Sequence, residues 1–256
     1  MAAPHASLDG AWQTYRAAYQ VLPTTEEARD RTFVILGTSH YGAPERFGLT
    51  RKTFVTPLGE TRTAVPLVDE LEQAAPGAVR MEDYCHAVEH SIEFQIVFLQ
   101  HLYGPTVRVL PILCGPFVKS IYEGGMPEDS EPVARFFDAL ANISAREGNR
   151  LFWVLAIDMA HIGVRYGDAI RATANAGEML AVEQRDRERI QQVNTGDIRN
   201  YWSLVQDRHD DLKWCGSSPL YTFMKTNPDA RGTLLDYHQW QIDPHSVVSF
   251  GAIGFQ

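Results

Sequence analysis

Four apolar runs of strand length recur along the chain and are separated by segments with a different periodicity. The runs are Phe33 to Leu36, Val107 to Leu113, Leu151 to Ile157 and Val247 to Ile253. Between them, Pro132 to Ala145 and Asp168 to Val193 carry apolar residues at helical spacing. Strands that alternate with helices predict an α/β fold, with one sheet flanked by helices on both faces.

Two further helices are predicted, one before the first apolar run and one between the first and second runs. One covers Ala11 to Val21, and the other opens at Glu89 and is apolar on nearly all sides, so we expect it to be buried. The segment Tyr122 to Pro132 is rich in glycine, proline and acids and predicts a surface loop. The charged patch Glu183 to Glu188 is most simply a solvated helix face.

The apolar stretch before His5 consists only of Met1, Ala2 and Ala3, which is little for a strand. Either this strand is short or the chain is truncated here. We expect residues 1–256 to form a single domain.

Composition narrows the functional classes. The net charge is −9 and no run of lysines and arginines could follow a phosphate backbone, so nucleic acid is not an expected partner. No apolar stretch approaches bilayer length and no leader pattern opens the chain, so we expect a cytoplasmic protein without membrane contact. Three separated cysteines form no disulfide framework or CxxC zinc motif.

Two histidines lie where strands are expected to end. His40 follows the apolar run that begins at Thr32, and His5 follows the short N-terminal stretch. Open α/β sheets bind ligands at the carboxyl ends of their strands, so both are candidate ligands. The alternatives are a loop histidine that forms local hydrogen bonds for His40 and an ordinary terminal residue for His5.

Two more sites combine a histidine with a carboxylate. Glu89 and Glu93 flank His90, and Glu93 lies three residues on along the same helical face, so that a carboxylate could orient the imidazole or raise its pKa. Plain charge at a helix start is the alternative. Asp158 and His161 follow the strand that begins at Leu151, and their spacing would let the aspartate hold the imidazole in one tautomer. This pair is the best general acid/base candidate. His86, four residues before His90, gives only a weak HxxxH signal.

Cys215 precedes Gly216, Ser217, Ser218 and Pro219, a pattern typical of a helix start. A thiol beside a helix N-terminus is expected to have a lowered pKa and to serve as soft metal ligand or nucleophile. The alternative is an inert, half-buried cysteine, which is our reading of Cys85 and Cys114.

Seven segments together resemble the Memo family in order and spacing, over nearly the whole chain. They are Ala3-Pro-His5-Ala, Leu36-Gly-Thr-Ser-His40, Thr56-Pro-Leu-Gly59, Glu89-His-Ser-Ile-Glu93, Val109-Leu-Pro-Ile-Leu-Cys-Gly115, Ile157-Asp-Met-Ala-His161 and Cys215-Gly. The resemblance implies a fold like that of the class III extradiol dioxygenases, non-heme iron enzymes with a metal in a cleft at the strand ends.

The resemblance also implies roles for individual residues. His5, His40 and Cys215 match the positions expected to bind a metal, whereas His90, Asp158 and His161 match residues that would line the cleft and supply acid/base chemistry. The chain departs from the family in lacking a longer N-terminal segment and in carrying apolar residues around Asp158. Both departures affect the shape expected for the cleft.

Three functions follow from this resemblance. The first is a redox enzyme that uses Fe(II) or copper, although a thiolate ligand argues against true ring cleavage, which uses two histidines and a carboxylate. The second is a noncatalytic protein that binds a peptide or small acidic ligand, for which only Arg46, Arg51, Lys52 and Arg165 lie near the motifs. The third is service beside radical SAM and AMMECR-type proteins in a modification pathway.

Overall fold

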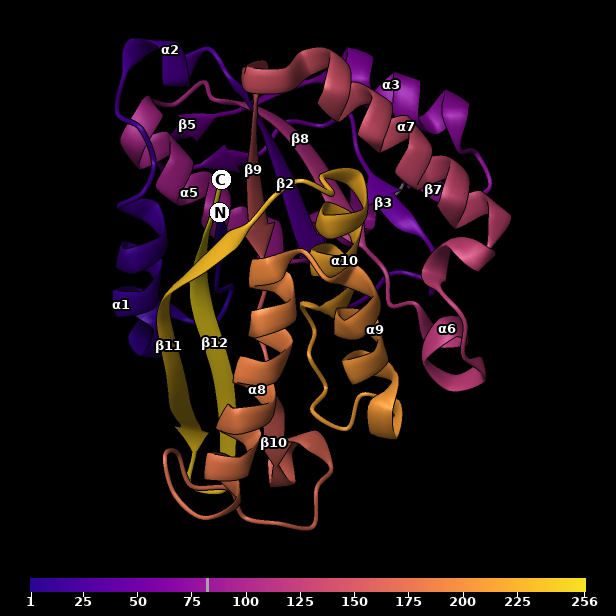
Figure 1. The fold of residues 1–256 in the computed structure, drawn as a ribbon. Coiled ribbons are helices and arrows are strands. Elements are labelled where there is room, and N and C mark those ends of the chain that lie inside the picture. Colours follow the sequence, from indigo (N-terminus) through magenta and orange to yellow (C-terminus); the bar gives the residue numbers. More distant parts are fainter. Residues whose placement is uncertain (82) are drawn as a thin grey trace.

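A computed structural model describes residues 1–81 and 83–256 and has a mixed α/β architecture (Figure 1). Its main sheet has ten strands, ordered β10-β12-β1-β9-β2-β8-β3-β7, with β11 paired to β12 and β6 to β8. The strands are β1 Ala2–Ala3, β2 Thr32–Thr38, β3 Phe47–Leu49, β6 Arg62–Thr63, β7 Val79–Met81, β8 Arg108–Cys114, β9 Leu151–Ala156, β10 His161–Gly163, β11 Gly232–Asp243 and β12 Ser246–Phe255. A separate two-stranded sheet pairs β4 Val55–Thr56 with β5 Gly59–Glu60.

Helices cover both faces of the sheet. They are α1 Leu8–Tyr19, α2 Glu26–Arg29, α3 Val65–Ala74, α4 Asp83–Val88, α5 Ser91–Tyr103, α6 Val118–Glu123, α7 Glu131–Glu147, α8 Glu178–Thr195, α9 Ile198–Gln206 and α10 Ser217–Thr226, with single 3-10 turns η1 Pro127–Asp129, η2 Gly148–Arg150, η3 Val164–Tyr166 and η4 Asp207–His209. Among the described residues, no helix is long and apolar enough to cross a membrane.

The two faces of the sheet bury two separate cores because successive strand side chains point to opposite sides. Val34 and Leu36 of β2 belong to a core shared with α3, α7, α8, α9 and α10, whereas Phe33 and Ile35 belong to a core shared with α1 and α5. Figure 1 shows α8, α9 and α10 in front of the strands and α1 and α5 along the other side. The predicted α/β sheet with helices on both faces is therefore confirmed.

The centre of the sheet is parallel. β2 pairs in parallel with both β8 and β9, and β1 pairs in parallel with β9. The carboxyl ends of β1, β2 and β9 consequently meet at one edge of the sheet, and His5, His40 and Asp158 all follow these ends. The four predicted strands all form, and the N-terminal strand exists as the two residues Ala2 and Ala3.

Three details of the predicted elements were wrong. The helix expected from Asp168 begins only at Glu178, because Asn175 and Gly177 adopt left-handed backbone conformations with φ of 58° and 55°. The predicted loop Tyr122 to Pro132 is partly helical, since α6 ends at Glu123, η1 follows and α7 begins at Glu131. The charged patch on α8 is not wholly solvated, because Asp186 within it is fully buried.

Candidate metal centre

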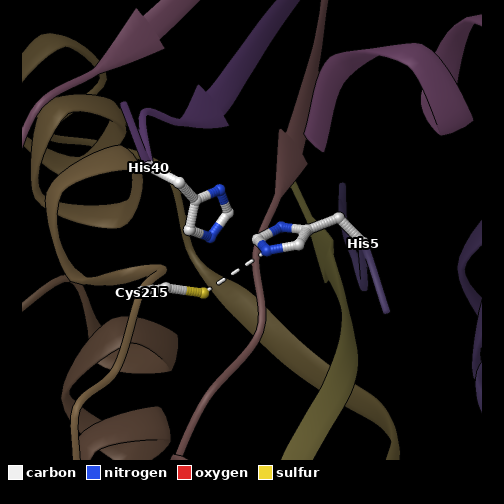
Figure 2. Close-up of side chains that lie close together, drawn as sticks. All are labelled: His5, His40 and Cys215. Atoms are coloured by element: carbon white, nitrogen blue, oxygen red, sulfur yellow. Dashed lines mark hydrogen bonds between the residues drawn. The ribbon is translucent and has the colours of Figure 1, made fainter. Parts of the chain in front are cut away.

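Three side chains from distant parts of the chain meet at the strand ends. His5 follows β1, His40 follows β2, and Cys215 lies just before α10. One ligand atom from each lies within 4.8 Å of the others, a spacing suited to a shared metal ion. Figure 2 shows both imidazole rings and the Cys215 sulfur facing a common centre.

His5 is held by the end of β9. Its ring is buried, and Nδ1 lies 3.0 Å from the Ala156 carbonyl oxygen, to which it donates. This assigns the proton to Nδ1 and leaves the Nε2 lone pair for the site, 3.4 Å from Cys215 Sγ. Burial lowers the pKa of His5 to about 4, so the ring is neutral at physiological pH despite the nearby Asp158 carboxylate.

Glu89 orients His40 and is the functional residue that the sequence analysis missed in this role. Its carboxylate accepts hydrogen bonds from the backbone N–H of His40 at 2.8 Å and from His40 Nδ1 at 2.9 Å. Burial raises the pKa of Glu89, but hydrogen bonds with His40 and His90 outweigh burial and hold that pKa well below its usual value. Figure 2 shows the other ring nitrogen of His40 facing His5 and Cys215.

A close approach of α5 to β2 places Glu89 at this position. A Cβ added to Gly37 in β2 would lie 2.7 Å from Ser91 Oγ and from the Ile92 side chain, so only glycine admits the helix here. Ser91 Oγ donates to the Thr38 carbonyl at 2.9 Å and fixes the start of α5 on the end of β2. The segment that carries Glu89 is thereby docked beside His40.

His90 lies against the candidate ligands. Its ring stacks on His40 with centroids 5.1 Å apart and meets the edge of His5 at 5.4 Å. His90 Nδ1 is 3.2 Å from Glu89, and the hydrogen bond to this carboxylate raises the pKa of His90. His40, Glu89 and His90 form a second group with ligand atoms within 4.8 Å. The carboxylate hydrogen-bonded to His90 is therefore Glu89, whereas the helical spacing favoured Glu93.

The prediction of a lowered thiol pKa at Cys215 was wrong. Burial, followed by the charge of Asp158, raises the pKa of this thiol well above its usual value. These two effects outweigh any lowering of the pKa by the N-terminus of α10, because burial disfavours the charged thiolate. The neutral Cys215 thiol donates to the Asp158 carbonyl at 3.5 Å, and its sulfur lies 3.4 Å from His5 Nε2.

Asp158 does not hold His161 as the DxxH spacing predicted. The Asp158 carboxylate accepts from the backbone N–H groups of His5 and Ala6 at 3.0 and 3.3 Å and lies 3.6 Å from His5 Nε2. His161 Nδ1 instead donates to the Met159 and Lys213 carbonyls at 2.9 and 3.1 Å. Asp158 therefore fixes the loop that carries His5, and backbone carbonyls set the tautomer of His161.

His161 remains close enough for its charge to be coupled to the site. Burial lowers the pKa of His161, the Asp158 carboxylate raises it, and the His40 imidazole lowers it. Its ring also meets the Tyr166 ring edge-on, with centroids 5.0 Å apart. The net direction keeps His161 neutral near pH 7, with Nε2 able to accept a proton.

A buried carboxylate supports the segment that carries Cys215. Asp186 of α8 accepts hydrogen bonds from Trp214 Nε1, Tyr237 Oη and Ser249 Oγ at 2.6, 2.8 and 2.6 Å. Ser249 Oγ in turn accepts from the Ala160 backbone N–H at 2.8 Å. Burial raises the pKa of Asp186 to about 6, although all three hydrogen bonds act to lower it.

Other sequence candidates lie outside this arrangement. His86 points its Nε2 to the Gly48 carbonyl at 3.1 Å and packs against Phe54. Cys114 is buried in β8, and burial raises its pKa to about 12, in line with the expectation of an inert thiol.

The donor set fits a transition metal. Neutral imidazole and thiolate are ligands for copper, zinc and iron, and metal-bound histidines typically donate their second ring nitrogen to a carbonyl or carboxylate. His5 and His40 both satisfy this second condition, through Ala156 and Glu89. The two histidines are therefore fixed in the orientation that ligation requires.

Fold and site define an α/β protein with a candidate histidine-histidine-cysteine metal centre, and the sequence matches the Memo-like protein family over residues 1–254. The chain belongs to this family. It is 25% identical to a MEMO1 family protein of Aquifex aeolicus, covering 98% of this chain and 62% of the relative. It is 27% identical to one from Methanosarcina mazei, covering 98% and 83%, and 28% identical to one from Thermococcus kodakarensis, covering 86% and 72%.

Proposed function

We propose that this protein is a metal-dependent oxidoreductase in which His5, His40 and Cys215 bind Fe(II) or copper. The observation that carries the proposal is the anchoring of both histidines through Nδ1, by the Ala156 carbonyl and the Glu89 carboxylate. His5 is buried and His40 is exposed, yet each ring has one nitrogen engaged in this way and the other directed toward a second imidazole and a thiol. Bound metal would supply one-electron chemistry toward O2 or an organic substrate.

The protein's own residues prepare the site before metal arrives. The low pKa of His5 keeps its ring neutral, so no proton has to leave this ligand at pH 7. The raised pKa of Cys215 means that its thiol must lose a proton on binding metal, as ligating thiols do. Glu89 stays ionised and stabilises the positive charge that a metal would place near His40.

His161 is proposed as the proton acceptor. Its Nδ1 is engaged with two backbone carbonyls, so the ring cannot rotate without loss of both hydrogen bonds. Its lowered pKa leaves the Nε2 lone pair available at neutral pH. Asp158 is proposed as a positioning residue, since it binds the backbone at His5 and Ala6.

The alternative of an acidic-ligand binding protein has less support. A phosphate site requires a cluster of cations, but Arg51 is engaged by Asp69 at 2.7 Å and by Glu72. Arg46 donates to the carbonyl of its neighbour Glu45 at 2.8 Å. Two of the four cations near the motifs therefore already contact protein groups and are less available to a phosphate.

Metal content by mass spectrometry tests the proposal. The protein is purified anaerobically as wild type, Cys215→Ala and His40→Ala, with Cys85→Ala and His238→Ala as controls for loss of a thiol and an imidazole elsewhere. Each is loaded separately with Fe(II) and Cu(I), and O2 consumption is followed. Circular dichroism confirms that each variant is folded.

Near-stoichiometric metal is expected in the wild type and both controls, together with metal-dependent O2 consumption. Both site variants should lose the metal. Absence of metal from the wild type under either loading would overturn the proposal, as would equal retention by Cys215→Ala. Metal bound without O2 consumption or any redox response would contradict the oxidoreductase assignment and leave a metal-binding protein.

A further inference from the structure

A hollow lies away from the candidate metal centre, on the core side formed by α1 and α5. Its volume is about 540 Å³, within the range of roughly 300 to 1,000 Å³ typical of small-molecule sites. Leu8, Trp12, Tyr15 and Tyr19 of α1 lie on one side, and Phe98 and Leu102 of α5 on the other. None of the residues discussed at the metal centre lines it.

The floor of this α1/α5 pocket is a fixed aromatic surface. Phe98 stacks on Tyr15 and on Tyr19, with centroids 4.7 and 4.8 Å apart. The two tyrosine hydroxyls point away from the pocket, since Tyr15 donates to the Ala6 carbonyl and Tyr19 to Gln95 Oε1. Tyr15 and Tyr19 therefore present the carbon atoms of their rings to the pocket and not their hydroxyl oxygens.

Its rim exposes apolar surface that the fold leaves uncovered. Trp12 is 53% exposed and Leu8, one helical turn earlier, is 46% exposed. A half-exposed indole beside a stacked aromatic floor provides a second ring face for an apolar ligand. Together these groups favour an occupant with an apolar body of modest size.

The charged side chain that lines the pocket is a cation, Arg16. Arg16 and His101 line it, whereas its lining contains no aspartate or glutamate, in a chain of net charge −9. Within residues 1–81 and 83–256, Arg16 makes no ion pair or side-chain hydrogen bond. An unengaged guanidinium at an apolar pocket favours an anionic head group, which it can bind in a bidentate manner.

We propose that the α1/α5 pocket binds a small carboxylate with an apolar body. The carboxylate lies against Arg16, and the body lies between Trp12 and the floor formed by Tyr15, Tyr19 and Phe98. Aromatic and aliphatic acids share this chemistry, and the probes below separate them. The proposal does not depend on the function proposed for the metal centre.

Isothermal titration calorimetry tests this with defined probes. The full chain is titrated with 2-naphthoate, octanoate and the neutral 2-naphthol. The variants are Arg16→Gln and Trp12→Ala, and the control is Arg135→Gln, an exposed arginine on α7. Metal content and circular dichroism are measured for each, so that a folding defect or an effect at the metal centre is recognised separately.

A saturable carboxylate site with unchanged affinity in Arg135→Gln is expected. Arg16→Gln and Trp12→Ala should each weaken binding about tenfold, and 2-naphthol should bind more weakly than 2-naphthoate. Tighter binding of octanoate than of 2-naphthoate would assign an aliphatic ligand, and the reverse an aromatic one. Equal affinity for 2-naphthol and 2-naphthoate, or no saturable binding of either acid, would overturn the proposal.

Discussion

Two buried carboxylates hold the two sides of the candidate metal centre and differ in their state. Glu89 accepts hydrogen bonds from two imidazole-bearing residues and their backbone, and its pKa lies below the usual range. Asp186 accepts three hydrogen bonds from neutral tryptophan, tyrosine and serine groups, and burial raises its pKa to about 6. Glu89 therefore has more donors than Asp186, and the number and kind of donors and the degree of burial decide the outcome.

The difference separates an electrostatic role from a structural one. Backbone N–H groups and protonatable rings stabilise the anion at Glu89, which therefore keeps its charge over the whole physiological range. Neutral donors at Asp186 do not fully offset the loss of water, and the side chain serves to tie α8 to Trp214 and β12. Substitutions at the two positions should accordingly affect different measurements.

The largest expected effect is on stability, at Asp186. Asp186→Ala would leave the Trp214, Tyr237 and Ser249 donors without their acceptor in the core and should lower the free energy of unfolding by about 3 to 5 kcal/mol. Urea unfolding measures this. The matched control is Glu188→Ala on the exposed side of α8, expected to change stability by less than about 0.5 kcal/mol. Similar values for both variants would contradict the structural role.

The next effect is on metal affinity, at Glu89. Glu89→Gln keeps the size of the side chain but removes the charge that orients His40, so affinity for Fe(II) or copper should fall about 10- to 100-fold. Competitive titration with a chelator measures it, with Glu93→Gln on the exposed face of α5 as control. The contrast with Asp186 fails if Glu89→Gln leaves affinity intact and instead destabilises the fold by several kcal/mol.

The smallest effect is a difference in pH dependence. Because the folded-state pKa of Asp186 is about 6, above its usual 3.8, its contribution to stability is complete below about pH 3.8 and is lost as the pH rises through 6. Glu89 behaves in the opposite way. Its contribution is complete above its usual pKa of 4.5 and is lost as the pH falls toward the lower folded-state value.

Urea unfolding between about pH 3 and pH 7 compares these directions. The advantage of wild type over Asp186→Asn should shrink as the pH rises from about 4 to 7. The advantage over Glu89→Gln should shrink as the pH falls from about 5 to 3, a range in which the titration of His90 does not contribute. If both stability differences changed with pH in the same direction, the distinction between Asp186 and Glu89 would be contradicted.

The sequence predicted the sheet because its strands are continuous apolar runs with clear ends. The boundary of α8 was missed because left-handed conformations at Asn175 and Gly177 depend on contacts that only the folded chain supplies, such as the Gln239 side chain accepting from the Asn175 backbone. β11 was missed as well, since its polar stretch Asp236-Tyr-His-Gln has no apolar run to mark it.

Within the site, the positions of His5 and His40 at strand ends followed from the sequence, but their partners did not. Glu89 reaches His40 across 49 positions and Asp158 reaches His5 across 153. No local spacing encodes such contacts, and the DxxH spacing favoured a pairing that the fold does not make. The burial of Asp186 within a charged run could not be predicted either, because its partners Trp214, Tyr237 and Ser249 are also distant in sequence.

The two-residue strand β1 also determines when the site is complete. Ala2 pairs with Leu155 on one side and with Ile253 on the other, so the first strand is held by one of the last. A chain still emerging from the ribosome can build β2, β8 and β9 and carry His40, but it lacks β12 beside β1. His5 and Cys215, 210 positions apart, meet only after the segment between them has been synthesised. The three-residue group is therefore assembled only after Cys215 has been synthesised and β12 has paired with β1.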